Sequence, residues 1–274
     1  MNEYRTPKEF REICRNGLHT THTSGVLPGY LQANLLILPS REAQDFVDLC
    51  YRNPVACPIL AISKEDPTAL DNEIFAKQGE VDIRTDFPKY NVYRGGHLIS
   101  QKNNCNEEWN KNYIGFLIGC SYSFERALTI AGLCPKNITL GKNVAMFKTS
   151  KYLNPAGIFV NCCYVVSMRP YKPEDLQRVR EITRKFKKTH GEPIDWGFDG
   201  AKRLGIHNIL NPDYGDMIEI LPTEIPVFWA CGVTPQLAIE TVGHLIEGPV
   251  VSHAPGCMLV CDAKDDFFCK NSSF

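Results

Sequence analysis

The sequence predicts an α/β fold in which mixed β-sheets and flanking helices pack in layers. Short apolar segments alternate with amphipathic segments along the 274 residues, a pattern typical of strands that are covered by helices. Several amphipathic segments begin with residues typical of a helix N-terminus, a threonine cap followed by proline, as at Thr6 with Pro7 and at Thr234 with Pro235. Because 43% of the residues are hydrophobic, the chain can bury one large core or two closely packed ones.

The predicted helices follow from caps and apolar faces. Thr6 and Glu9 form a capping-box pattern, so a short helix should run to Arg15 and stop at Gly17. Ser40 should cap a second helix, whose apolar face is Ala43, Phe46, Val47 and Cys50. Further helices are predicted over residues 122–131, 173–188 and 234–243.

The predicted strands are the short apolar runs between these helices. They cover residues 35–38, 58–62, 91–93, 144–147, 164–168, 218–221, 227–230 and 258–261. The strand at 91–93 should turn at Gly95 and Gly96. Without an internal repeat or a low-complexity linker, residues 1–274 are expected to form a single unit, with residues 263–274 as a loosely attached tail.

Composition narrows the class of protein. The net charge is −1 with both signs well mixed, so neither nucleic acid nor a membrane is an expected partner. The polar N-terminus lacks an apolar signal core, which favours a cytoplasmic protein, with the mitochondrial matrix as an alternative. We therefore expect the twelve cysteines to be reduced. Their spacing offers no pair of metal-ligand motifs, and no metal site is expected.

The segment from Phe116 to Glu125 is the strongest local signal for chemistry. An apolar run ends at Gly119, where a sharp turn is expected, and Ser121 is a natural N-cap for the next helix. Free amide groups at that helix start would face whatever lies in front of Cys120, which suits a carboxylate or a developing oxyanion. The alternative is a buried strand-to-helix junction with no chemical role.

This segment resembles the Gly-Cys-Ser-Phe-Ser-Phe-Glu block of the hydro-lyase family that also contains the front part of vertebrate D-glutamate cyclase. Further blocks follow in the family's order, and the resemblance runs from about residue 7 to about residue 262. They are residues 32–35, 38–39, 82–86, 143–149, 165–170, 212–216, 226–236 and 253–256. The resemblance implies two interleaved α/β lobes. It also implies a cofactor-independent lyase for a small amino or hydroxy acid, in its sharpest form one that cyclises D-glutamate to 5-oxo-D-proline and water.

Cyclisation of D-glutamate requires groups that hold a carboxylate. Arg84 and Arg169 are candidates because a guanidinium matches a carboxylate in a bidentate manner. For Arg84 the alternative is a salt bridge to Asp82 or Asp86. Further polar candidates for substrate binding are Gln32, Asn34 and Asn143, the first two on the same face of an extended segment.

Proton transfer needs titratable groups near the substrate. His253 is the first candidate, since its ordinary pKa suits work near neutrality, and Glu125 in the first turn of its helix is the second. Both have structural alternatives, a hydrogen-bonded loop histidine and a helix-capping carboxylate. Asp213 and Asp216 flank a turn, where one could bind its own backbone while the other receives the substrate ammonium.

Cys120 could act as a nucleophile, but thioester formation from a free carboxylate is uphill without an activating group. Cys120 and Ser121 are therefore expected as hydrogen-bond donors around the carboxyl group. Neither a Walker nor a Rossmann glycine pattern is present, so no ATP or nicotinamide cofactor is expected.

Some features of this chain differ from the family and weaken the inference that it acts on the family's substrate. Residues 194–199 replace a His-x-Gly-Asp-Pro stretch of the family, and Cys257 stands where bacterial relatives often carry histidine. The vertebrate cyclase also has a second domain. A non-catalytic metabolite-binding module or partner subunit in 5-oxoproline metabolism therefore remains the alternative function. For either function the chain could assemble as a homo-oligomer.

Overall fold

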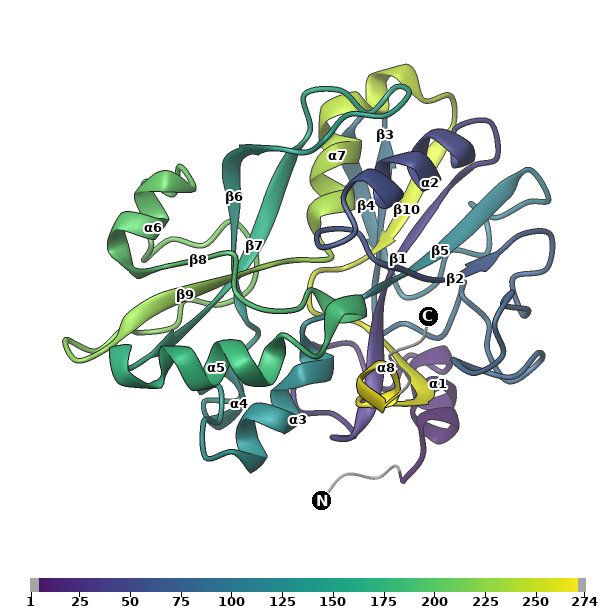
Figure 1. The fold of residues 1–274 in the computed structure, drawn as a ribbon. Coiled ribbons are helices and arrows are strands. Elements are labelled where there is room, and N and C mark those ends of the chain that lie inside the picture. The colour runs from purple at the N-terminus through teal and green to yellow at the C-terminus, as the bar shows by residue number, and fades with distance from the viewer. Residues whose placement is uncertain (1–4, 271–274) are drawn as a thin grey trace.

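The computed structural model describes residues 5–270, whose strands form two sheets (Figure 1). The first sheet contains β1 (Tyr30–Pro39), β2 (Ile59–Ser63), β3 (Tyr90–Arg94), β4 (His97–Lys102), β5 (Tyr113–Gly119), β10 (Pro249–His253) and β11 (Leu259–Lys264). Their order is β2-β5-β1-β10-β3-β4, with β11 also paired to β1. The second sheet contains β6 (Ala145–Tyr152), β7 (Cys163–Tyr171), β8 (Asp195–Trp196) and β9 (Ile225–Ala230), in the order β6-β7-β9-β8.

The second sheet is inserted between β5 and β10 of the first. The chain leaves the first sheet after β5, builds all of the second, and returns through β10 beside β1 (Figure 1). This insertion confirms the predicted α/β class and the two interleaved lobes. All the pairings between these strands are antiparallel, so the strand direction is more uniform than in the mixed sheets expected.

Eight α-helices lie within the described residues: α1 (Pro7–Arg15), α2 (Ala43–Arg52), α3 (Tyr122–Ile130), α4 (Lys136–Thr139), α5 (Leu176–Thr183), α6 (Gly197–Arg203), α7 (Thr234–Val242) and α8 (Phe267–Lys270). The capping box of Thr6 and Glu9 is confirmed at the start of α1. The cap of α2 is Glu42 and not Ser40. In residues 5–270 no helix is long and apolar enough to cross a membrane.

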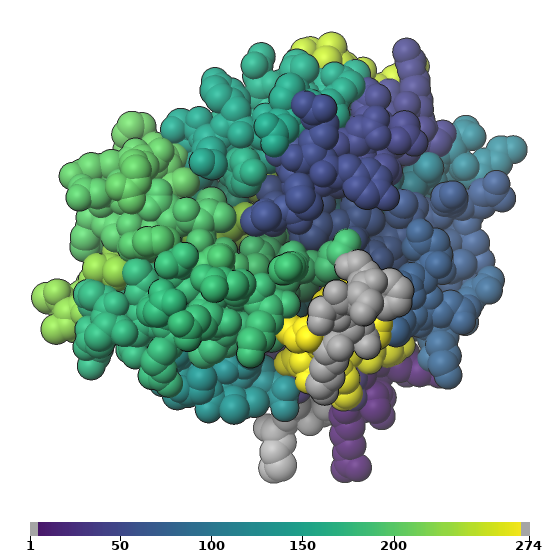
Figure 2. Space-filling view, viewed as in Figure 1, coloured from purple at the N-terminus to yellow at the C-terminus, as the bar shows by residue number. Residues whose placement is uncertain are grey.

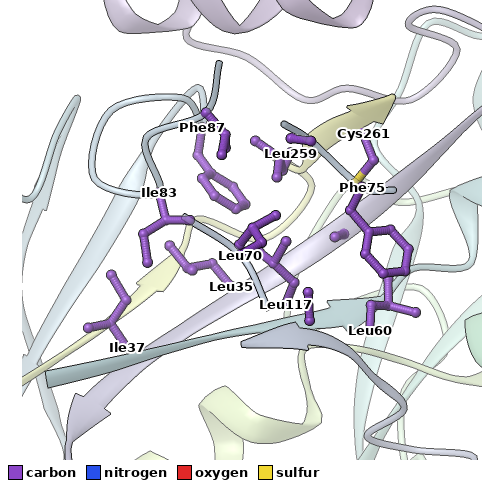
Figure 3. Packing of buried hydrophobic residues seen from close by; sticks show 14 of the residues in the cluster. Leu35, Ile37, Leu60, Leu70, Phe75, Ile83, Phe87, Leu117, Leu259 and Cys261 are labelled. Carbon is purple, nitrogen blue, oxygen red and sulfur yellow. The ribbon is translucent and has the colours of Figure 1, made fainter. Parts of the chain in front are cut away.

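Strand β1 is buried on both faces, which explains the unbroken apolar run of residues 35–38. Its odd-numbered residues, including Leu35 and Ile37, belong to a core with Leu117 of β5 and Leu259 of β11, and the side chains converge in Figure 3. Its even-numbered residues Leu36 and Leu38 belong to a second core that includes residues of α2 and α7. Gln32 and Asn34 also occupy even-numbered positions, so this face combines the second core with polar groups.

Two predicted elements are wrong in extent or type. The helix expected over 173–188 is interrupted: a 3₁₀ turn at Pro173–Asp175 precedes α5, and another at Lys187–Thr189 follows it. Residues 218–221 form no strand. Ile218 and Ile220 pack on the core of the second sheet, while Lys142 and Lys136 donate to the carbonyl oxygens of Met217 and Glu219.

The residues expected to form a loose tail divide into two parts. Residues 263–270 finish β11 and form α8, where Phe268 packs against the core of the first sheet. Residues 271–274 lie outside the described part of the chain. Strands β4, β8 and β10 and helices α4 and α6 were not predicted from the sequence.

Candidate active site

The junction between β5 and α3 is buried and internally bonded. Ser121 occupies the N-cap position but makes no capping bond, and its Oγ instead accepts a hydrogen bond from Arg169 Nη2 at 3.1 Å. The amides of Tyr122, Ser123 and Phe124 bond Cys120 Sγ, Cys120 O and Ser121 O. The prediction of free amides at this helix start is therefore wrong, because the turn that begins the helix uses them.

Gly119 is required here for close packing and not for a turn. A Cβ atom at this position would lie 1.9 Å from the carbonyl oxygen of Lys188, in the 3₁₀ turn that follows α5. The glycine thus lets the second lobe approach the end of β5. This contact lies beside Cys120 and Ser121 and fixes the entry of α3.

Arg169 of β7 and Glu125 of α3 form a buried ion pair between the second sheet and this helix. The Nη2 and Nε atoms of Arg169 donate to Glu125 Oε1 at 2.7 and 3.1 Å, and Nη1 donates to Ser167 Oγ at 3.2 Å. The guanidinium also lies 5.0 Å from the ring centre of Phe124 and 5.5 Å from that of Trp229. Arg169 is fully buried, so its charge depends on this pairing.

Glu125 has one oxygen bonded and one oxygen without a partner. Its Oε1 accepts from Arg169 and, at 3.0 Å, from Asn137 Nδ2, whereas its Oε2 has no hydrogen-bond partner although it is buried. Burial raises the pKa of Glu125 above its ordinary value, against the opposing effects of Arg169, Asn137 and His22. A carboxyl group with a raised pKa and a free oxygen is suited to accepting and returning a proton.

A cavity of about 130 Å³ is lined in part by Glu125. The loop of residues 25–30, Gln32, and Arg126, Thr129 and Ile138 form its wall together with Tyr122 and Glu125. Arg126 is the most water-accessible charge of the wall, with 45% of its side chain exposed. Since one water occupies about 30 Å³, the cavity suits a molecule no larger than a small amino acid.

Gln32 holds the loop that covers this cavity. Its Oε1 accepts from Thr23 Oγ1 at 2.7 Å, and its Nε2 donates to the carbonyl oxygens of Thr23 and Val26. Leu27 has a φ of 43°, a conformation that costs free energy for a branched side chain and is held here by the surrounding bonds. Gln32 therefore lines the site but already uses its side chain to shape it.

His253 lies in the core, apart from the cavity. Its Nδ1 accepts from the amide of Leu35 at 3.1 Å, and Gln236 Nε2 donates to its carbonyl oxygen at 2.9 Å. Burial lowers the pKa of His253 to about 4, so the ring is neutral near pH 7. Of the predicted roles, this environment supports the structural one, in which His253 joins β10 to β1.

Asn34 and Asn143 make contacts between segments that are distant in sequence. Asn34 Nδ2 donates to Gly119 O at 2.7 Å, while its buried Oδ1 has no partner. Asn143 Oδ1 accepts from the hydroxyl of Tyr122 at 2.5 Å, and its Nδ2 donates to Pro255 O at 3.0 Å. Asn143 thus orients the Tyr122 ring in the cavity wall, whereas Asn34 is not part of that wall.

Cys120 is buried in the same apolar cluster as Cys231. Burial raises the pKa of its thiol far above the ordinary value, which leaves the thiolate unpopulated at neutral pH. This environment agrees with the expectation that Cys120 is not a nucleophile.

The remaining predicted residues lie away from the cavity. Arg84 binds Asp82 in a bidentate pair at 2.7 and 2.9 Å, which confirms the salt-bridge alternative. Asp213 and Asp216 are exposed and accept from the amides of Lys148 and Asn143. Neither aspartate is among the residues that line the cavity.

Sequence reasoning missed three residues around Glu125: His22, Arg126 and Asn137. Arg126 directly follows Glu125, but its approach to the loop of residues 25–30 depends on tertiary packing. Asn137 lies in the four-residue helix α4 and His22 in a loop, and neither segment is long enough to carry a periodic signal. The signal that pointed toward this region was the family block from Phe116 to Glu125.

A second hollow lies on the face in Figure 2, where the α2 region meets the segment after α5. This groove of about 430 Å³ is lined by Pro54, Val55, Arg184, Lys187 and residues 190–194. None of these residues bonds to Glu125 or Arg169. The smaller cavity is therefore the candidate active site, since it alone of the two is lined by a residue with a buried carboxyl group and an unpartnered oxygen, Glu125.

Comparisons with known proteins agree with the sequence blocks. The family model described as D-glutamate cyclase matches residues 114–262. A protein of Schizosaccharomyces pombe named "Putative hydro-lyase" is 45% identical over 93% of this chain and 84% of its own length. Proteins with the same name from Rhizobium johnstonii and Staphylococcus haemolyticus are 44% and 41% identical, over 94% and 95% of this chain and 93% and 96% of their own.

A crystal structure of a nitrogen repressor-like protein from Methanococcus jannaschii gives a TM-score of 0.35 at 11% identity, covering 91% of this chain and 96% of that one, which is too low to support an inference. The sequence relatives are decisive, because they match nearly the full length at high identity. The chain belongs to the D-glutamate cyclase family of hydro-lyases.

Proposed function

We propose that this protein is a lyase that converts D-glutamate to 5-oxo-D-proline and water in the cavity beside Glu125. The family supports a hydro-lyase, and the substrate is our proposal. The single observation that carries it is the state of Glu125. This buried carboxyl group is anchored through one oxygen, while its other oxygen is unpartnered and its side chain forms part of the cavity wall.

The reaction has simple proton requirements. The amine nitrogen attacks the γ-carboxyl carbon, an N–C bond forms, and a C–O bond breaks. Two protons leave the ammonium nitrogen and both finish on the departing oxygen, so no external oxidant or reductant takes part. One carboxyl group can move each proton in turn, provided that its pKa lies above the ordinary range, as that of Glu125 does.

The neighbours of Glu125 support this role by fixing its orientation. Arg169 and Asn137 hold Oε1, which leaves Oε2 as the atom that exchanges protons. In this assignment Arg169 positions Glu125 and does not hold the substrate carboxylate, since its guanidinium donates hydrogen bonds to Glu125, Ser121 and Ser167. A precisely held acid–base group avoids reorganisation during the reaction.

The test is an NMR time course of the purified protein with D-glutamate and, separately, with 5-oxo-D-proline. L-glutamate is the stereochemical control, and Cys120→Ala tests the thiol. The proposal predicts stereoselective interconversion that survives in Cys120→Ala. Folded protein that converts neither compound in either direction would refute the cyclase and leave the non-catalytic binding module as the alternative.

A further inference from the structure

The groove between the α2 region and the segment after α5 (Figure 2) adjoins two further hollows. It shares Arg184 with a hollow of about 550 Å³ on α5, and it shares Pro54 and Lys187 with one of about 230 Å³ at the end of α2. Together they form a surface channel, the α5 groove, lined by residues 50–51, 54–55, 57–59, 178, 181–182, 184–185, 187–188 and 190–194. A long channel that is open to solvent suits an extended chain better than a compact small molecule.

The α5 groove is basic, although the chain as a whole has a net charge of −1. Its wall contains the cationic residues Arg178, Arg184, Lys185, Lys187 and Lys188 and the carboxylates Glu181 and Glu192, an excess of three positive charges. The three lysines are exposed, and none of them forms an ion pair within residues 5–270. A surface with unneutralised positive charge attracts an acidic partner.

The α5 groove also presents apolar side chains to solvent. Pro54, Val55, Pro193 and Ile194 line its middle part, where 42% of Val55 is exposed. Tyr51, at the end beside α2, is 78% exposed. Exposed apolar side chains that are bordered by charged ones are typical of an interaction site, because a partner can bury the former and pair with the latter.

Contacts between distant segments hold the wall of the groove in place. His190 Nδ1 donates a hydrogen bond to the carbonyl oxygen of Val55 at 2.8 Å, which ties the loop after α2 to the segment after α5. The amide of Gly191 donates to the carbonyl oxygen of Phe186 at 2.9 Å, and Lys188 packs against Gly119 through its own carbonyl. Since the groove is already formed, a partner that binds there does not have to order it.

We propose that the α5 groove is the docking surface for an extended acidic peptide segment of a partner protein. Apolar side chains of that segment would pack on Val55 and Ile194, while its carboxylates would pair with Lys187 and Lys188. In an extended peptide, alternate side chains point to opposite sides, so a segment in which acidic and apolar residues alternate matches both features of the groove.

Two observations favour a peptide over a nucleic acid. Glu181 and Glu192 belong to the wall and would repel a uniformly negative backbone. A phosphate backbone would also leave the apolar side chains of the groove uncovered. The α5 groove shares no lining residue with the cavity beside Glu125, so this inference is independent of the proposed function.

The test measures binding of dye-labelled probes to the full chain by fluorescence anisotropy. The first probe is a peptide of four alternating Glu and Leu pairs. In the second, Ser replaces Leu, in the third, Lys replaces Glu, and the fourth is a single-stranded oligothymidylate of the same length. The proteins are the wild type, Val55→Ser, the double variant Lys187→Gln with Lys188→Gln, and the control Lys111→Gln, an exposed lysine outside the groove. Circular dichroism checks that each variant is folded.

We expect the Glu–Leu peptide to bind the wild type about ten-fold more tightly than any other probe. Val55→Ser and the double lysine variant should each weaken that binding by about five-fold or more, and Lys111→Gln should leave it unchanged. The proposal is overturned if the Glu–Leu peptide does not bind, or if the Glu–Ser peptide, the Lys–Leu peptide or the oligothymidylate binds equally well. These comparisons of probes with the wild type do not depend on the folding of any variant.

Discussion

At the scale of single residues, the pairing of Arg169 with Glu125 organises the site. Both residues were candidates from the sequence, because one follows a strand and the other opens a helix. Their contact with each other was not predicted, since it joins positions 44 apart in sequence and depends on the packing of β7 against α3. Similarly, the sequences around His253 and Cys120 do not show that both side chains are buried. Burial lowers the pKa of the histidine and raises the pKa of the thiol.

Removing one partner of this buried pair should strongly destabilise the protein. Arg169→Met leaves Glu125 without its cation, and we expect the free energy of unfolding to fall by about 3–5 kcal/mol. The double variant Arg169→Met with Glu125→Gln should be more stable than Arg169→Met alone, because it leaves no unpaired charge. Urea denaturation measures both, and a loss below about 1 kcal/mol for Arg169→Met would contradict this account of the pair.

At the scale of elements, one helix was predicted with nearly correct bounds and another was predicted too long. Residues 122–131 were predicted as a helix and α3 covers 122–130, because its cap position and apolar face are local features. The helix predicted over 173–188 was too long. Its sequence is locally amphipathic, but the chain must leave the helix so that Lys188 can meet Gly119.

The contact between Gly119 and Lys188 gives a prediction about packing. Gly119→Ala places a methyl group on the Lys188 carbonyl oxygen, so the 3₁₀ turn must move and we expect a loss of roughly 2–4 kcal/mol. The control is Gly132→Ala, which has open space around it but a φ of 78° and should cost only about 1–2 kcal/mol. Equal losses in thermal or urea denaturation would show that the close contact is unimportant.

At the scale of the whole molecule, alternating short apolar and amphipathic segments predicted the α/β class, and the interleaved lobes followed from the family resemblance. The order of the strands was not accessible, because β10 pairs with β1 across more than two hundred residues. The cavity was not accessible either. It arises where the loop of residues 25–30 closes over α3, a contact that no local pattern encodes.

Two buried histidines should make stability depend on pH. Burial lowers the pKa of both His190 and His253 from 6.5 to about 4, so between these values the unfolded chain binds more protons than the folded one. The contribution of these histidines to the free energy of unfolding is fully present above pH 6.5. It falls as the pH is lowered toward 4, by about 3 kcal/mol for each histidine. Carboxyl groups with raised pKa values, such as Glu125, act in the opposite direction.

A comparison of two variants isolates the contribution of His253 to the pH dependence of the unfolding free energy. His253→Gln should flatten the fall in unfolding free energy between pH 7 and pH 4.5 relative to wild type, as measured by urea titrations across that range. His207→Gln, at an exposed position, should leave the profile unchanged. An unchanged pH profile in His253→Gln would contradict the assignment of a buried neutral ring at that position.

The central claim is that Glu125 moves the protons of D-glutamate cyclisation, and the most direct test is the turnover number of Glu125→Gln. This variant keeps the shape of the side chain and its contact with Arg169 but cannot exchange the proton. The account predicts a folded protein whose kcat falls by about 10²–10⁴-fold, with stereoselective turnover in the wild type. A folded Glu125→Gln variant that cyclises D-glutamate at a rate near that of the wild type would contradict it.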